Sequence, residues 1–113
     1  MMDSVETRMN ETKISLFLGT YGLDSFKLQD LGDLTKPIPR TDLANTIQRV
    51  ADREDVPVQK ITVSLVSCDG YVIQNWAISD YGDWKKLGPR HQLLSEVADA
   101  IAKERTNQEN DFQ

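Results

Sequence analysis

Two segments of the chain decide its fold: residues 21–54, YGLDSFKLQDLGDLTKPIPRTDLANTIQRVADRE, and residues 71–104, YVIQNWAISDYGDWKKLGPRHQLLSEVADAIAKE. They align without a gap at an offset of 50 residues. Nine of the 34 aligned positions are identical, whereas chance would give about two. Immediately upstream, Lys13–Leu18 matches Lys60–Leu65 at an offset of 47. This self-similarity predicts an internal duplication.

The first part of each copy has the two-residue period of a β-hairpin. In the first copy, alternate apolar residues precede a turn at residues 21–24, and Phe26 and Leu28 continue on the return strand. In the second copy, the strands meet at the Asp69-Gly70 turn. The expected core positions of the two hairpins are Ile14, Leu16, Leu18, Phe26, Leu28, Ile61, Val63, Leu65, Val72, Trp76 and Ile78.

After each hairpin the apolar spacing changes to the period of an α-helix. The stripes consist of Leu43, Ile47, Val50 and Ala51 in the first copy and of Leu93, Leu94, Val97 and Ile101 in the second. Pro39 and Pro89 suit the first turn of a helix, so helices are predicted over residues 39–53 and 89–105. The predicted fold is α+β: an internally duplicated ββα-ββα chain whose four-stranded antiparallel sheet carries two helices on one face.

A chain of 113 residues is long enough for one core of this kind. We expect a single duplicated domain over residues 13–104, made of half-repeats 13–54 and 60–104. Residues 1–12 and 105–113 are polar and have no apolar stripe. They are therefore predicted to be disordered tails.

The net charge of -5 and the isoelectric point near 4.7 argue against a nucleic-acid partner, whose backbone requires clustered basic residues. The densest basic group, Lys85, Lys86, Arg90 and His91, reads as a solvated loop and first helical turn. The chain has no apolar run near 18 residues and no signal-like amino terminus. A cytoplasmic protein that does not enter a membrane is expected.

The sequence offers no pair of residues suited to nucleophilic catalysis. A lone Cys68 excludes an intrachain disulfide and a thiolate metal cluster. The one histidine, His91, is predicted to lie on a different element from Cys68, which disfavours a Cys–His pair. Neither an enzymatic activity nor a cofactor is expected.

A repeated Asp-x-Gly-Asp segment connects each hairpin to its helix. Its carboxylates, followed in each copy by an arginine, are Asp30 and Asp33 in the first copy and Asp80 and Asp83 in the second. In a turn, the glycine permits positive φ and the aspartates accept hydrogen bonds from the backbone. In a site, four carboxylates would supply oxygen ligands for calcium or magnesium if the two corners met. The turn is the favoured interpretation, and whether the corners meet is left open.

Tyr81 and Trp84 make this segment more aromatic in the second copy, because they replace Leu31 and Leu34. Trp84 has no clear phase with the core residues. It either covers the seam between helix and sheet or forms an exposed anchor of the kind that dominates the binding energy of protein interfaces.

The sheet face opposite the core is more apolar than a solvated face requires. The residues expected on it are Ser15, Phe17, Thr62, Ser64, Val66, Tyr71, Ile73 and Ala77. Three interpretations stay open: a homodimer packed sheet on sheet, a different protein bound to this face, and apolar residues that are simply scattered over a surface.

Together these features predict a small acidic protein–protein interaction module, such as an adaptor, inhibitor or accessory factor, without catalytic activity. Its candidate partner-binding residues are Trp84, Tyr81, Tyr71, Ile73 and Phe17. The alternative is a regulatory domain that binds a metal or small ligand at the Asp/Arg corners. On the first hypothesis, Ile73→Glu leaves the fold intact and abolishes association.

Overall fold

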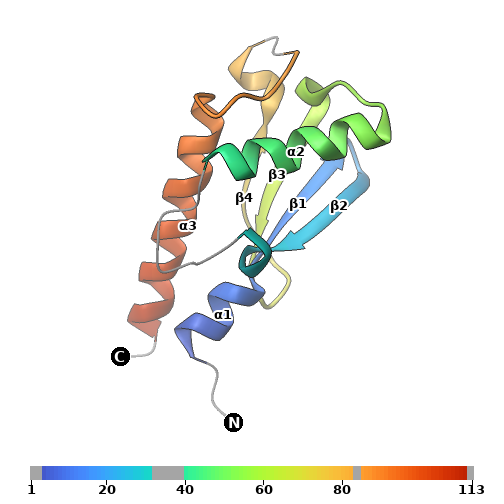
Figure 1. Ribbon diagram of the computed structural model, residues 1–113. Coiled ribbons are helices and arrows are strands. Elements are labelled where there is room, and N and C mark those ends of the chain that lie inside the picture. Colours follow the sequence, from blue (N-terminus) through green and yellow to red (C-terminus); the bar gives the residue numbers. More distant parts are fainter. Residues whose placement is uncertain (1–3, 32–39, 83–84, 112–113) are drawn as a thin grey trace.

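The computed structural model describes residues 4–31, 40–82 and 85–111, and in them it shows a four-stranded antiparallel sheet with three α-helices. The strands lie in the order β2-β1-β3-β4 (Figure 1). Their bounds are β1 Lys13–Leu18, β2 Tyr21–Lys27, β3 Ile61–Val66 and β4 Val72–Ala77. The predicted α+β class and the four-stranded antiparallel sheet are confirmed.

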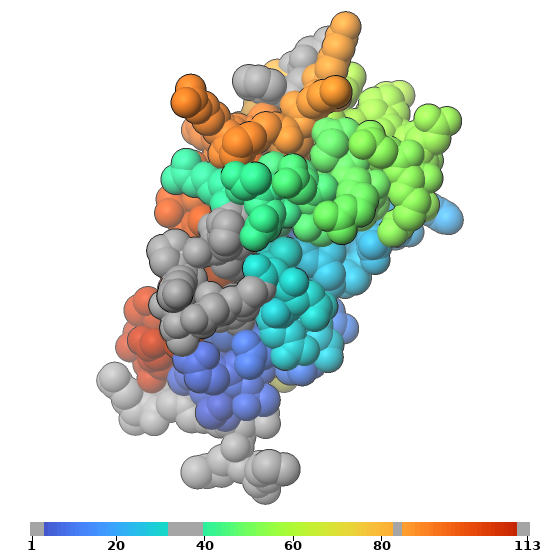
Figure 2. All heavy atoms as spheres, in the orientation of Figure 1, coloured from blue at the N-terminus to red at the C-terminus, as the bar shows by residue number. Residues whose placement is uncertain are grey.

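The helices connect and flank these strands. The α-helices are α1 Val5–Glu11, α2 Arg40–Glu54 and α3 Gln92–Asp111. Short 3-10 helices are η1 Leu28–Leu31, η2 Val58–Lys60 and η3 Ile78–Tyr81. The order strand, strand, 3-10 helix, α-helix thus occurs twice. In the space-filling view, α2 and α1 lie one above the other on the side that faces the reader (Figure 2).

The core forms where alternate side chains of the two central strands meet the apolar stripes of the helices. Ile14 lies opposite Leu65 and Leu16 opposite Val63, and all four side chains are fully buried. The predicted stripe residues of α2 and α3 are buried in the same cluster. Figure 1 shows α2 crossing the sheet and α3 running alongside it.

The first hairpin turns three residues earlier than predicted. Gly19 has a φ of 63°, a value that favours glycine, and Tyr21 already pairs with Leu18. The predicted turn at residues 21–24 is therefore wrong, since these residues belong to β2. The second hairpin turns at residues 67–70, as predicted.

A β-bulge in β4 reverses the faces of two residues. Val66 lies opposite Val72, whereas Leu65 lies opposite Gln74, so Ile73 is the extra residue. As a result Val72 is 52% exposed, and Ile73 is half-buried against the core. The predictions that Val72 is a core residue and that Ile73 lies on the outer face are wrong, because strict alternation assumes a regular ladder.

Beyond the bulge, the residues of β4 face the sides of the sheet that the alternating pattern predicted. Trp76 lies opposite Val63 and is buried, and Ile78 is fully buried. Within the part of the chain that the structure describes, the indole Nε1 of Trp76 has no hydrogen-bond partner. The bulge thus affects the beginning of β4 and leaves its end regular.

Because Val72 and Ile73 exchange faces, Ile73→Glu, which the sequence suggested, is unsuitable as a surface variant. Ile73→Glu is expected to lower the free energy of unfolding by about 2–4 kcal/mol, because it places a carboxylate against the core. Val72→Glu should change it by less than about 0.5 kcal/mol, because that side chain already meets water. Urea unfolding of both variants measures the difference, and equal losses would show that the bulge is absent.

Both chain ends differ from the predicted disordered tails. α1 occupies residues 5–11, its first turn is capped by the Ser4 hydroxyl, and Met9 is only 2% exposed within the core. At the other end, α3 continues to Asp111. The apolar pattern could not reveal either extension, because α1 buries a single large side chain.

Polar contacts hold the two ends together. Arg8 Nε donates to the Gln108 side chain at 2.6 Å, and Gln108 in turn donates to Glu104 Oε1 at 2.8 Å. Arg105 forms an ion pair with Glu6. The last turns of α3 are therefore packed through hydrogen-bonded polar side chains rather than through an apolar stripe.

Truncation of Met9 tests whether α1 belongs to the folded body. Met9→Ala should lower the free energy of unfolding by about 2–3 kcal/mol, because it leaves a cavity in the core. Thr7→Ala, on the exposed side of α1, should change it by less than about 0.5 kcal/mol. Thermal or urea unfolding compares the two variants. If residues 5–11 were a frayed tail, both substitutions would leave stability unchanged.

Candidate functional site

The two aspartate corners are placed by η1 and η3. Asp30 and Asp80 each occupy the third residue of the corresponding 3-10 helix. Asp30 Oδ2 accepts a hydrogen bond from the backbone N–H of Lys27 at 3.3 Å, which agrees with the turn interpretation. Asp33 and Asp83 lie outside the described residues.

The two described carboxylates of these corners, Asp30 and Asp80, do not meet. β2 ends opposite Lys13, whereas β4 ends opposite Thr62, which pairs with Phe17. The two positions are thus separated by four residues of β1, about 13 Å along the strand. Among the described residues, no group of three or more His, Cys, Asp or Glu side chains could hold a metal ion.

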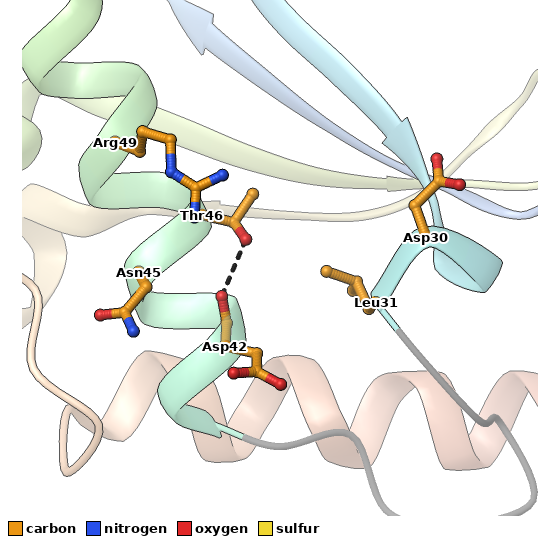
Figure 3. Close-up of a pocket in the computed structure, with 6 residues that line it drawn as sticks. All are labelled: Asp30, Leu31, Asp42, Asn45, Thr46 and Arg49. Atoms are coloured by element: carbon orange, nitrogen blue, oxygen red, sulfur yellow. Dashed lines mark hydrogen bonds between the residues drawn. The ribbon is translucent and has the colours of Figure 1, made fainter.

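A polar pocket lies beside the Asp30 corner. It has a volume of about 260 Å³ and is lined by Asp30, Leu31, Asp42, Asn45, Thr46 and Arg49 (Figure 3). The Thr46 hydroxyl donates to the carbonyl oxygen of Asp42 at 2.8 Å and is thereby engaged within α2. The pocket offers two carboxylates and one guanidinium group, which supply contacts both for a cation and for an anion such as phosphate.

His91 is built into the beginning of α3. Its side chain is 3% exposed, and its Nδ1 accepts a hydrogen bond from the backbone N–H of Leu93 at 3.1 Å. This is the position and geometry of an N-cap, so α3 begins at Gln92 instead of residue 89, and Pro89 lies in the preceding turn. Burial lowers the pKa of His91 from its ordinary value.

Tyr81 packs against this histidine. The two rings meet edge to face with centroids 5.6 Å apart. Burial, followed by the hydrogen bond to Glu96 and the negative charge of that carboxylate, raises the pKa of Tyr81 to about 12. Tyr81 is therefore a half-buried side chain that joins η3 to α3, and only part of it is accessible to a partner.

His91 and Cys68 lie at opposite ends of the sheet. Cys68 follows β3 beyond the pair formed by Val66 and Lys13. His91 contacts Tyr81, which follows the other end of β4. The structure does not bring these two side chains together as a nucleophile and base.

The capping role of His91 predicts a pH dependence of stability. The unfolded chain protonates this residue near pH 6.5, whereas the folded protein requires a lower pH. The stability that neutral His91 contributes is therefore present above pH 6.5 and is lost as the pH falls below it. A protonated ring cannot accept the Leu93 N–H, and its charge is unfavourable at a helix N-terminus.

We expect His91→Asn, which keeps a cap acceptor without titrating, to lose less stability than the wild-type protein between pH 8 and pH 5.5. Urea unfolding at the two pH values measures this difference. An identical loss in both proteins would show that carboxylates alone account for the acid sensitivity.

The second candidate site is the sheet surface opposite the core, which we call the outer face. It carries Ser15, Phe17, Ser25, Thr62, Ser64, Val66, Val72, Asn75 and Ala77. The Ser15 and Ser25 hydroxyls share a hydrogen bond of 3.0 Å, and Ser64 donates to Asn75 Oδ1 at 2.5 Å. A hollow of about 300 Å³ on β1 and β2 is lined by Ser15, Phe17, Gly22, Leu23, Asp24 and Ser25.

The structure divides the five predicted partner-binding residues. Phe17 lies half-buried on the outer face, and Tyr71, whose carbonyl oxygen accepts from Ser67 N, is 56% exposed just before β4. Ile73 and Tyr81 pack against the core, and Trp84 lies outside the described residues. Sequence reasoning missed Val72, whose exposure depends on a bulge that leaves no signal in the alternating pattern.

No protein-family model, curated protein or solved structure matches the chain. None of the helices described has both the length and the apolar character needed to cross a bilayer. We therefore infer the function from the geometry of the two sites.

Proposed function

We propose that this protein is a small acidic interaction module that binds another protein through the outer face of its sheet and has no catalytic activity of its own. One observation carries the proposal: apolar side chains remain accessible on a sheet face whose opposite side already supplies the whole core. Val72 is half-exposed beside Val66, and Phe17 lies at the other end of the same face. Accessible apolar groups on such a face are typical of interaction surfaces.

The polar groups of the outer face favour a flat protein partner. Its serine hydroxyls already form hydrogen bonds across the strands, as in the Ser15–Ser25 and Ser64–Asn75 pairs. Covering these groups leaves few hydrogen bonds unmade, so desolvation costs little. Short side chains between the apolar residues also allow another surface to approach closely.

The architecture gives this surface its position. We take the two halves to be copies of one ββα unit, with both helices on the face that bears the core. The repeated order of elements and the single cluster formed by both apolar stripes support this arrangement. The helices then satisfy one face of the sheet and leave the other to a partner.

The use of the titratable groups supports a non-catalytic role. His91 is buried as a helix cap, and Asp30 and Asp80 follow opposite ends of the sheet. A general base needs an accessible lone pair within reach of a substrate, and the Nδ1 lone pair of His91 is occupied by Leu93.

Substitution of Val72 tests the outer face. Immobilised wild-type protein, Val72→Glu and Tyr21→Glu are compared for the partner that each retains from a host lysate, by quantitative mass spectrometry. Val72→Glu should reduce retention at least tenfold, about 1.4 kcal/mol of binding free energy, because it places a charge in the apolar contact. Tyr21 is 66% exposed at the opposite end of the sheet, so its substitution serves as the matched control.

Equal retention by Val72→Glu and the wild-type protein would rule out the outer face as the binding surface. Equal loss in both variants would indicate a general effect of added charge on this acidic protein.

Ligand binding at the pocket beside Asp30 is the second candidate function, favoured by the carboxylates and the guanidinium group that line it. A ligand bound only to the folded protein raises the melting temperature. Melting curves with millimolar calcium, magnesium or phosphate, repeated on Arg49→Gln, test this candidate. An unchanged melting temperature in all three would exclude these ligands.

A further inference from the structure

The hydrogen-bond phase of the sheet identifies which backbone groups point outward from its two edge strands. Leu28 N donates to Thr12 O at 2.8 Å, which fixes the phase of β1 with β2. Ser67 N donates to Tyr71 O at 2.8 Å, which fixes the phase of β3 with β4. In the regular part of each edge strand, away from its bulge, the outward groups are therefore those of Ser25 and Lys27 on β2 and those of Asn75 and Ala77 on β4.

The edge of β2 is closed by the protein's own side chains. Asp24 Oδ1 accepts from Ser25 N at 2.7 Å, and Asp30 Oδ2 accepts from Lys27 N at 3.3 Å. Arg53 reaches from α2 to the carbonyl oxygen of Leu23 and forms an ion pair with Asp24 at 3.3 Å. Charged side chains that occupy the outward groups of an edge prevent another strand from pairing there.

The edge of β4 has none of these protections. No side chain in the described part of the chain forms a hydrogen bond with the main chain of Asn75 or Ala77. The strand sequence, VIQNWA, contains neither a charged residue nor a proline. Its bulge lies at Ile73, so the outward groups of the last residues remain in a regular, extended segment. An uncharged edge with unpaired groups is a template for strand addition.

We propose that this edge pairs with the β4 edge of a second copy of the chain, in antiparallel orientation, so that two four-stranded sheets form one continuous sheet of eight strands. The two-fold axis passes beside Trp76. Asn75 of each copy then exchanges N–H···O bonds with Ala77 of the other copy, which gives four hydrogen bonds. The inference goes beyond the proposed function, because it uses the edge of β4 and not the outer face of the sheet.

A second copy fits this edge because the edge is self-complementary. The same two residues supply all the donors and acceptors, so an isologous pairing leaves none of their outward groups unpaired. Most of the surface of a protein with a net charge of -5 repels its own copy, whereas β4 is uncharged.

The groove beside β4 agrees with this pairing. It has a volume of about 240 Å³ and is lined by Gln74 and by Glu96, Asp99, Ala100 and Lys103 of α3. Asp99 and Lys103 are one helical turn apart and carry opposite charges. In an antiparallel pair of α3 helices, each can therefore face its counterpart on the other copy.

Sedimentation equilibrium over a range of protein concentrations tests the pairing. The wild-type protein should pass from 12.8 kDa to twice this mass. Ala77→Pro should raise the dissociation constant of the dimer at least tenfold, because proline removes two of the four intermolecular donors. The fold should survive, since this N–H takes no part in the ladder with β3 and the φ of -91° at Ala77 is close to that of proline.

Asn75→Asp provides a second variant in case the proline disturbs the strand. The Ser64 hydroxyl can still donate to the aspartate, while two carboxylates now lie close to the two-fold axis on one face. The dissociation constant should again rise at least tenfold. Ser25→Asp makes the same change of charge at the equivalent position of the closed β2 edge, and it should leave the dimer unchanged.

A wild-type mass that stays at 12.8 kDa up to millimolar protein would overturn the pairing. A dimer that tolerates Ala77→Pro and Asn75→Asp would also overturn it. If such a dimer is lost in Val72→Glu, the contact lies on the outer face, and the proposed function stands without the edge pairing. Retention of a lysate partner by Val72→Glu would instead refute the outer-face proposal and leave the edge pairing unaffected.

Discussion

The rest of the structure depends on the antiparallel register of the two central strands. β1 and β3 place Ile14 opposite Leu65 and Leu16 opposite Val63, and these four side chains belong to the same buried cluster as the apolar stripes of α2 and α3. A slip of one residue would turn the whole set to the other face and bring serines and a threonine into the core. Both strands also pair on their outer sides, with β2 and β4, which fixes those strands as the two edges.

The two edges occupy equivalent places in the two halves and have opposite chemistry. At the offset of 50 residues, Ser25 corresponds to Asn75 and Lys27 to Ala77. The first pair has backbone N–H groups that donate to carboxylates, whereas no described side chain forms a hydrogen bond with the backbone of the second pair, which lies in an uncharged strand. Similar local sequence patterns have therefore produced one closed edge and one edge suited to pairing.

Polar contacts account for the parts of the fold that hydrophobic patterning does not describe. The Ser4 hydroxyl caps α1, the His91 ring caps α3, and Gln108 links the end of α3 to Arg8. Each of these interactions joins residues whose apolar periodicity is weak or absent. They extend the folded body beyond residues 13–104 at both ends, where polar composition alone predicted disorder.

The sequence alone determined the class of the fold, the bounds of β1 and the apolar stripes of both helices. It could do so because alternation and the 3.6-residue period depend on neighbouring residues only. It also placed Phe17 on the face opposite the core. Only the tertiary structure decided that Val72 and Ile73 exchange faces and that Asp30 and Asp80 lie apart. A bulge and a register depend on where a strand pairs with its neighbour, and that choice is made by the packing of the whole core.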